Sequence, residues 1–352
     1  MTADVGTTAR RGFVRRHKVI AALVALLLVL AAAVAGFAFY LNAQIDEVAR
    51  YESKLREPLR PPPPTGEAAE AQNILLLGTD KGHGETIEDE LADGRWTPGA
   101  FRSDTVMIVH LPADRDEAYL VSIPRDSYVR VPGFGRQKVN AAFSFGGPDL
   151  AMRTIEDLTG VYLDHVAMID WTGFRHLTSA IGGVEVTVAE TFFDPKNNRT
   201  WQAGSHQLEG QEALDYVRTR YGLENGDFDR IKRQQNFLRA VMRKTVSNGT
   251  LANPVKLTNL VQAITDAATV DAGWTTAEIR ETALDLRHLR SNDVVYLTAP
   301  TRGYRDVQGI GSVVLLAQKE SRALWRSLRT DDVGAYLDKY GGERLPDAAA
   351  IP

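Results

Sequence analysis

Two arginines in the segment YVRTR, Arg218 and Arg220, have the spacing that points most directly to chemistry. If this segment is extended, residues two positions apart project from the same face, so the two guanidinium groups lie side by side. Their mutual repulsion is relieved when an anion lies between them. A guanidinium group binds phosphate oxygens through two parallel hydrogen bonds. The pair therefore predicts a phosphate-binding site.

The segment GDFDRIKRQQNFLRA, which follows the two arginines, supplies further polar groups. Asp227, Arg230 and Gln234 are spaced i, i+3 and i+7, so they share one stripe of a predicted helix. Arg233 lies beside that stripe. The amino-terminal end of a helix attracts anions through its dipole. A charged helix face is usually just solvated, but together with the same-face arginines it favours a pyrophosphate site.

Two acids lie at the ends of predicted strands. Asp80 closes the run NILLLGTD, and Asp104 stands in FRSDT, two residues after Arg102. Two carboxylates at adjacent strand ends suit Mg²⁺, a hard ion that prefers oxygen ligands and keeps several waters. Taken alone, the two acids are better explained by turn and capping chemistry, in which Asp is common.

A third group of polar residues follows the predicted strand that ends in SIPRD. The Pro–Arg–Asp turn places Arg125 at the edge of the sheet, with Lys138 and Asn140 shortly after it in QKVNAAF. An ion pair between Arg125 and Asp126 at the surface is the simpler alternative. The position at a strand end, where α/β folds usually bind ligands, favours a contribution to the same site.

Strands and helices alternate along the chain, which predicts an α/β domain. The predicted strands are 73–80, 105–111, 118–123, 165–170, 184–190 and 292–300. The predicted helices are 150–160, 173–183, 228–246 and the end of 312–331, and 211–220 begins as a helix and becomes β-like at the two arginines.

Composition excludes several classes of protein. The chain has no cysteine, which rules out thiol catalysis, cysteine-ligated zinc and disulfides. Its net charge is −4, but residues 1–18 carry five basic groups and one acid, so the rest sums to −8. Such an acidic domain lacks the surplus of cations that non-specific nucleic-acid binding needs.

The amino-terminal region predicts a membrane anchor. Residues 19–41 form a 23-residue run without a charge, and the basic residues 1–18 precede it. The positive-inside rule puts residues 1–18 in the cytoplasm and the domain outside the cell membrane. A cleaved signal peptide is the alternative, and it also exports the domain. Residues 42–71, with Pro61–Pro64, predict a stiff linker, and residues 336–352 a flexible tail.

The chain resembles the LytR-CpsA-Psr family of bacterial cell-envelope proteins. The motifs that carry the resemblance span about residues 72–245 and are NILLLGTD, RSDTVMIVHL, VSIPRDSYV, KVNAAFSFGG, AIGGVEV, QLEGQEALDYVRTR and GDFDRIKRQQNFLRA. The resemblance implies a three-layer α/β/α domain with a central mixed sheet, in residues 72–335. It also implies transfer of a phosphorylated glycopolymer, of teichoic acid or arabinogalactan type, from a polyprenyl pyrophosphate carrier to a peptidoglycan hydroxyl.

The family's functional positions transfer residue by residue. Asp80 and Asp104 are the implied ligands of Mg²⁺ or Mn²⁺, and Arg218, Arg220 and Asp227 the implied catalytic residues. The implied pyrophosphate-binding residues are Arg102, Arg125, Lys138, Arg230, Arg233 and Gln234.

The chain departs from the family pattern at Gly82, where Arg is frequent, and at Asp229, where Gly is frequent. Candidates for an apolar slot that takes the polyprenyl chain are Phe143, Phe145, Ile169 and Leu177. Two other functions fit the same motifs. One is a pyrophosphatase, in which water replaces the sugar hydroxyl, and the other is a non-catalytic, membrane-anchored envelope sensor or regulator.

Overall fold

A mixed β-sheet forms the centre of the protein in the computed structural model, which describes residues 31–80, 87–92, 96–247 and 253–351. Within this part of the chain the sheet has eight strands. In spatial order they are β1 (Ala49–Tyr51), β12 (Ala268–Asp271), β7 (His165–Asp170), β2 (Gln72–Thr79), β3 (Ser103–Leu111), β4 (Ala118–Ser122), β13 (Val294–Thr298) and β16 (Glu343–Arg344). The expectation of a mixed central sheet with helices is confirmed, and each predicted strand is present.

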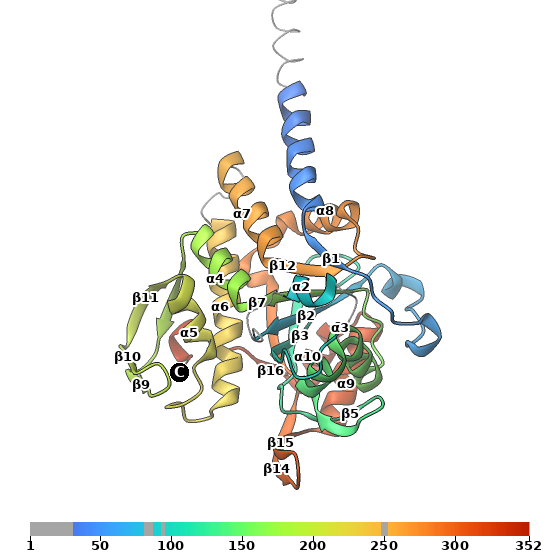
Figure 1. Cartoon of the computed structure of the whole chain (residues 1–352), viewed down its shortest axis with the longest axis vertical. Helices are drawn as coiled ribbons and strands as arrows, with labels where there is room; N and C mark the ends of the chain where they lie inside the picture. The colour runs from blue at the N-terminus through green and yellow to red at the C-terminus, as the bar shows by residue number, and fades with distance from the viewer. Residues whose placement is uncertain (1–30, 81–86, 93–95, 248–252, 352) are drawn as a thin grey trace, which may run out of the picture.

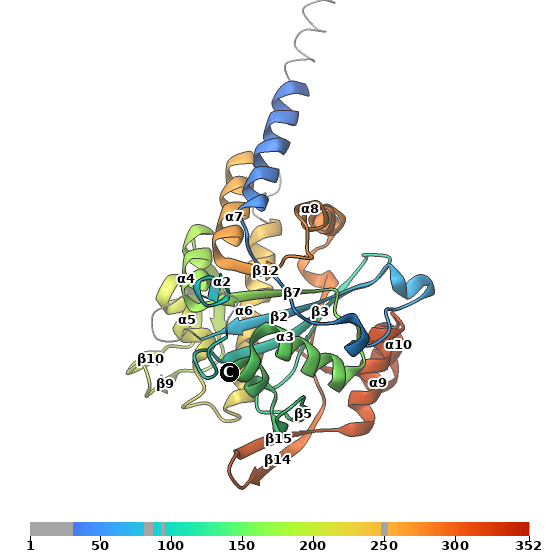
Figure 2. The same ribbon diagram turned by 45° about the vertical axis from the view of Figure 1, so that its right-hand side comes forward.

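Helices cover both faces of this sheet, as Figures 1 and 2 show. One layer holds α3 (Val139–Thr159), α9 (Gln318–Arg329) and α10 (Val333–Tyr340). The other holds α4 (Trp171–Ala180), α5 (Gly210–Arg218), α6 (Asp227–Ser247) and α7 (Pro254–Ala267). The remaining helices and 3-10 turns are α2 (Ile87–Ala92), α8 (Thr276–Asp285), Glu57–Leu59, Gly66–Ala69, Leu286–His288, Ser291–Asp293 and Ala348–Ala350.

The central strands are apolar because both of their faces are covered. Leu75 and Leu77 of β2 are fully buried against α3, while Ile74 of the same strand faces the layer of α6. The strand β2 pairs antiparallel with β3 and parallel with β7. This arrangement brings the end of β2, the start of β3 and the end of β7 to one edge of the sheet.

Four hairpin-like pairs lie outside the central sheet. They are β5 (Tyr128–Val131) with β6 (Gly135–Lys138), β8 (Val184–Val188) with β11 (Gly204–Leu208), β9 (Phe192–Asp194) with β10 (Arg199–Trp201), and β14 (Thr301–Val307) with β15 (Gly311–Leu316). In Figure 1 the β14–β15 hairpin projects from the bottom of the molecule, and β9–β10 lies beside α5. Both hairpins border the edge of the sheet described above.

Residues 31–46 are helical and leave the domain at the end opposite the β14–β15 hairpin (Figure 1). Their base is held to α8, where Arg280 Nη1 donates to Asn42 Oδ1 and Thr276 Oγ1 donates to Asp46 Oδ1. Residues 19–30 of the predicted membrane helix, and Gly82, lie outside the described residues. None of the described helices combines the length and apolarity needed to cross a membrane.

The predicted linker and tail are packed on the domain. Ala49–Tyr51 form an edge strand of the sheet, and Arg60, directly before the prolines, pairs with buried Glu156 at 2.7 Å. At the other end, α10 extends the fold to Tyr340, and Ile351 is fully buried. Both segments are stabilised by contacts with residues far away in the sequence, which local composition does not reveal.

Candidate active site

Arg125 lies at the centre of a cluster of charges at the edge of the sheet. Its Nη1 donates to Asp104 Oδ1, and its Nε donates to Asp227 Oδ2 at 2.8 Å. Arg230 Nη2 donates to the same oxygen of Asp227 at 3.0 Å, and Arg220 Nη1 lies 3.8 Å from Asp227 Oδ1. The carboxylate of Asp227 thus draws together guanidinium groups from three segments of the chain.

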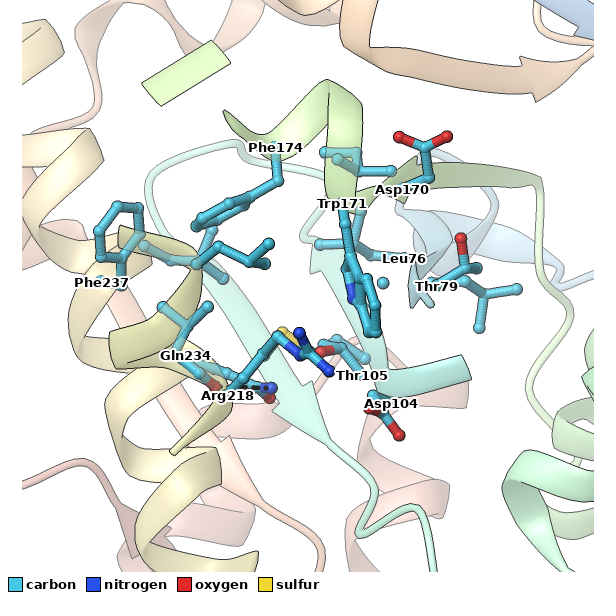
Figure 3. A pocket seen from close by; sticks show the side chains of 17 residues that line it. Leu76, Thr79, Asp104, Thr105, Asp170, Trp171, Phe174, Arg218, Gln234 and Phe237 are labelled. Atoms are coloured by element: carbon cyan, nitrogen blue, oxygen red, sulfur yellow. Dashed lines mark hydrogen bonds between the residues drawn. The ribbon is translucent and has the colours of Figure 1, made fainter. Parts of the chain in front are cut away.

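Arg218 reaches the cluster from a different direction. It is the last residue of α5, and its guanidinium carbon lies 3.4 Å above the centroid of the Trp171 ring. Figure 3 shows Arg218 between Trp171 and Asp104. Burial lowers the pKa of Arg218, and the carboxylates of Asp104 and Asp80 partly offset this. A fixed cation in so restricted a place is suited to an anionic ligand.

The prediction that Arg218 and Arg220 project from one face of an extended segment was wrong. The helix continues through Arg218, and extended conformation begins only at Thr219. Arg220 therefore turns toward Tyr221, whose hydroxyl it contacts at 2.7 Å, and toward Asp227. The two arginines still belong to one cluster, because Arg218 interacts with Asp104 and Arg220 with Asp227.

As predicted, Asp80 directly follows β2, and Asp104 lies at the start of β3, the neighbouring strand. The two carboxylates have different environments. Burial raises the pKa of Asp80, and the charge of Asp104 adds to this effect. Burial also acts to raise the pKa of Asp104, but Arg125, Arg230 and Arg218 lower it below its ordinary value. A cation between the two acids would relieve the repulsion that Asp80 experiences.

These two carboxylates fit Mg²⁺. Among the described residues, no group of three or more His, Cys, Asp or Glu side chains is placed to hold a metal ion. Mg²⁺ does not need such a group, because it commonly binds through one or two carboxylates, with water and substrate phosphates completing its shell. Asp80 and Asp104 lie at the ends of neighbouring paired strands, where two carboxylates could serve such an ion.

An apolar pocket opens beside the cluster, between strands β2, β3 and β7 and helices α4, α5 and α6. Its walls include Leu76, Met107, Ile169, Phe174 and Phe237. Asp104, Arg218 and Gln234 line the same pocket and stand together in Figure 3. The pocket therefore joins an apolar interior to a charged mouth.

Of the four residues predicted to line an apolar slot, Ile169 lines this pocket. Phe143 is instead part of the core between α3 and the sheet, and Phe145 stacks on Phe134 with ring centroids 4.6 Å apart. Leu177, on α4, is not among the described residues that line the pocket. Periodicity identified apolar positions but not the face of the sheet to which they turn.

The remaining predicted phosphate ligands differ in how close they lie to the cluster around Arg125. Lys138 Nζ pairs with Asp126 Oδ1 at 3.0 Å beside the cluster, while the Arg102 side chain is exposed and its backbone N–H donates to Asp80 Oδ1. Gln234 Nε2 donates to Val217 O at 3.4 Å.

Arg233 does not join the cluster. Its side chain is fully buried, with its guanidinium carbon 4.1 Å from the ring centroid of Phe192 and 5.0 Å from that of Tyr216. Burial lowers its pKa to about 10. Arg233 therefore serves the packing of α6 against α5 and β9, because it points away from the stripe shared by Asp227 and Arg230.

Sequence reasoning missed a second layer of residues around the arginines. Asp194, at the end of β9, is fully buried and accepts a hydrogen bond from Thr219 Oγ1 at 2.9 Å. It also accepts from the backbone N–H of Lys196 at 3.0 Å. Burial lowers the pKa of Lys196, followed by the positive charges of Arg218 and Arg220, which puts this lysine near the cluster. The only sequence signal was the turn-forming stretch DPKNN.

The fold and the site together define an α/β protein with an apolar pocket that opens at a cluster of arginines and carboxylates. The chain belongs to the LytR-CpsA-Psr family, since the family model described as the LytR_cpsA_psr family matches residues 38–330. The motifs in the sequence had indicated this family, and the match confirms it.

Named relatives agree with this assignment. The chain is 38% identical over 258 residues to the probable cell wall biosynthesis protein LcpB of Corynebacterium glutamicum, covering 73% of this chain and 61% of that protein. It is 33% identical to the polyisoprenyl-teichoic acid–peptidoglycan teichoic acid transferase TagU of Enterococcus faecalis, covering 61% of this chain and 65% of that protein. The chain thus spans less than two thirds of the length of these two relatives.

A solved structure has the same fold. The LytR-Csp2A-Psr enzyme from Actinomyces oris superposes with a TM-score of 0.62 at 20% identity, over 80% of this chain and 96% of that one. At this identity the likeness shows the fold alone.

Proposed function

We propose that the protein is a phosphotransferase that moves a phosphorylated glycopolymer from a polyprenyl pyrophosphate carrier to a hydroxyl of peptidoglycan. The observation that carries the proposal is the position of Arg218, Arg125 and Asp104 at the mouth of an apolar pocket. The pocket has room for an apolar chain, and the arginines donate hydrogen bonds to the phosphate groups attached to that chain. The name of the relative from Enterococcus faecalis, a polyisoprenyl-teichoic acid–peptidoglycan teichoic acid transferase, supports this class of substrate.

In the proposed reaction the hydroxyl oxygen of the acceptor attacks the phosphorus that bears the glycan. The bond from that phosphorus to the bridging oxygen breaks, so the products are a phosphodiester and polyprenyl phosphate, and the hydroxyl proton leaves to a base or water. Such a reaction needs positioning and charge stabilisation more than covalent help from the protein. Arg125, Arg218, Arg220 and Arg230 supply both, because they are fixed before the substrate arrives.

Asp80 and Asp104 would hold Mg²⁺ (or Mn²⁺), which would neutralise charge on the pyrophosphate. Asp227 is proposed as a residue that positions the arginines and not as the general base. Its oxygens already face Arg125, Arg230 and Arg220.

We further propose that residues 19–41 anchor the chain in the cell membrane, with residues 1–18 in the cytoplasm and the domain outside. Support comes from the uncharged sequence of this segment and from the helix at residues 31–46, which leads away from the domain (Figure 2). This arrangement gives the apolar pocket access to a carrier lipid in the same membrane.

Arg218→Ala provides the direct test. The full chain in lipid vesicles is mixed with a polyprenyl pyrophosphate that carries a labelled glycan and with uncrosslinked peptidoglycan strands, with Mg²⁺ or with a chelator. The variant should lose transfer by at least about 1000-fold, as do phosphotransferases that lose an arginine on the transferred group. Arg322→Ala, which removes an exposed arginine on α9, is the matched control.

Transfer by a folded Arg218→Ala variant at the wild-type rate would refute the assignment. Label released by wild type only as free phosphorylated glycan would show a pyrophosphatase. Lipid bound tightly with no turnover would show a sensor or regulator instead.

A further inference from the structure

The β14–β15 hairpin is attached to the same loop that carries Arg125. The backbone N–H of Val314 donates to Asp126 O at 2.8 Å, and Ser127 forms a parallel bridge with Val314. Asp126 and Ser127 directly follow Arg125. The hairpin, which projects from the domain in Figures 1 and 2, is thus an extension of the candidate active site.

Tyr304 is an aromatic residue that the hairpin displays next to the cluster. It is 57% exposed, and its ring packs at 64° against Phe228 with centroids 5.6 Å apart. Phe228 follows Asp227 in the first turn of α6. Burial, followed by the charges of Asp227 and Asp126, raises the pKa of Tyr304, so its hydroxyl remains protonated. The packing of the core does not require an aromatic ring at so exposed a position.

Arginines from two hairpins flank a second aromatic ring on this side. The guanidinium carbons of Arg305, on β14, and Arg136, on β6, each lie 5.6 Å from the centroid of Tyr128. Phe134, at the turn between β5 and β6, is 49% exposed. We call Tyr128, Phe134, Arg136, Tyr304 and Arg305 the hairpin surface. It is basic and aromatic, although the chain beyond residue 18 has a net charge of −8.

We propose that the hairpin surface binds the acceptor, a peptidoglycan strand, an inference that rests on the proposed function. Sugar rings present flat C–H faces that pack on exposed aromatic rings. The carboxylates of the peptide side chains on such a strand pair with arginine through charge-assisted hydrogen bonds. A surface that alternates Tyr and Phe with Arg therefore matches an anionic glycan in both shape and charge.

The direction of the reaction assigns this surface to the acceptor and not to the lipid carrier. The apolar pocket meets the cluster at Asp104 and Arg218, whereas the hairpin meets it at Asp126 and Phe228. The attacking and leaving oxygens of a phosphoryl transfer lie roughly in line on opposite sides of the phosphorus. With the leaving polyprenyl phosphate in the pocket, the hydroxyl must approach from the other side, where the hairpin surface lies.

The test compares the Tyr304→Ala/Arg305→Ala double variant and the Arg136→Ala variant with wild type and Arg322→Ala. Each full chain in lipid vesicles is titrated with uncrosslinked peptidoglycan strands at saturating labelled donor. The KM for strands should rise about tenfold in each hairpin-surface variant, which corresponds to one lost charge-assisted hydrogen bond. Hydrolysis of the donor in the absence of strands, and its Kd, should stay at the wild-type value, which also shows that the variant is folded.

Conservative variants distinguish the loss of a contact with the strand from the loss of the folded state. Tyr304→Phe keeps the ring and should keep the wild-type KM, and co-sedimentation with insoluble peptidoglycan should show the same ranking of variants without any turnover. An unchanged KM in the double variant, with wild type active, would overturn the inference. So would a raised Kd for the donor at constant KM for strands, because the surface would then hold the glycan of the donor. Absence of transfer by wild type would instead refute the proposed function, and co-sedimentation would still decide whether the surface binds strands.

Discussion

At the scale of single residues, Asp227 and the acids at the strand ends have different tasks. Asp227 faces three guanidinium groups, so its charge is balanced by the residues that it holds. These contacts make Asp227 a residue that holds the arginines in position. Replacement of Asp227 should therefore slow catalysis, because the arginines would no longer be held in position.

Asp227→Asn tests this role. The amide keeps the size and one oxygen acceptor but loses the charge, so kcat should fall by roughly tenfold or more, the cost of one charge-assisted hydrogen bond. The pH profile of kcat/KM should keep the limb that wild type shows at low pH, since a positioning residue does not create that limb. Loss of the limb in the variant would identify Asp227 as the general base.

Asp80 and Asp104 should affect stability with opposite signs. Folding raises the pKa of Asp80, so its contribution to stability is present at low pH and is lost as the pH rises through the folded-state pKa. Folding lowers the pKa of Asp104, so its contribution is present above its unfolded-state pKa and is lost as the pH falls through the folded-state pKa. At neutral pH, ionised Asp80 therefore destabilises the metal-free protein.

Asp80→Asn should accordingly raise the thermal unfolding midpoint at neutral pH without metal. Wild type should gain stability on addition of Mg²⁺, because an ion that binds only the folded state stabilises it, and the variant should lose most of that gain. Asp116→Asn, a change at an exposed acid, provides the control. Equal responses of wild type and Asp80→Asn to Mg²⁺ would place the metal elsewhere.

At the scale of elements, the β9–β10 hairpin fixes the end of α5. Asp194 holds Thr219, which stands between the two arginines. Gly222, with φ of +79°, brings the following loop so close that a Cβ would lie 2.2 Å from Phe193 O. The arginines are therefore presented by a short loop clamped to a hairpin, and the precision of their placement depends on that clamp.

Thr219→Val removes the hydrogen bond to Asp194 at nearly constant volume. We expect kcat to fall about tenfold, because the buried carboxylate loses a partner and the arginines on both sides of Thr219 shift. Thr191→Val removes hydroxyl contacts at the other end of the hairpin, with Gln202 and Ala203, and should leave kcat unchanged. Equal kcat in the two variants would show that the clamp does not position the arginines.

The sequence predicted some of these elements correctly and others wrongly. Alternation and apolar runs located the central strands, because those strands are buried on both faces and carry the strongest pattern. The arginine cluster was also predicted, since strand ends and a helix start bring its residues together. The end of α5 and the buried Arg233 were predicted wrongly, because the contacts of Arg218 with Trp171 and of Arg233 with Phe192 join segments distant in sequence.

At the scale of the whole molecule, the segment after the helix at residues 31–46 and the carboxy-terminal residues are both built into the domain. Tyr51 lies in an edge strand paired with β12, and Leu345 N donates to Tyr296 O at 3.0 Å. The prolines predicted a stiff linker and the position at the end of the chain predicted a flexible tail, because local sequence does not report long-range contacts. The domain is consequently held close to the helix at residues 31–46.

Arg60 attaches the amino-terminal segment to the domain. Its side chain pairs with Glu156, which is fully buried, and its guanidinium carbon lies 3.9 Å from the centroid of Tyr162. Arg60→Ala should destabilise the detergent-solubilised chain by about 3 kcal/mol or more in chemical denaturation, because it leaves Glu156 buried without its cation. Arg56→Ala, a change at an exposed neighbour, should have little effect.

The double variant Arg60→Ala/Glu156→Gln distinguishes a buried charge from lost packing. Burial raises the pKa of Glu156, so this carboxyl is costly to keep ionised once Arg60 is gone. Glutamine removes the charge and keeps an acceptor for the backbone N–H of Leu163, which donates to Glu156 at 3.1 Å. The double variant should therefore recover part of the stability lost in Arg60→Ala. If the two losses simply add, the ion pair does not anchor the segment, and the contact with Tyr162 is left as its main attachment.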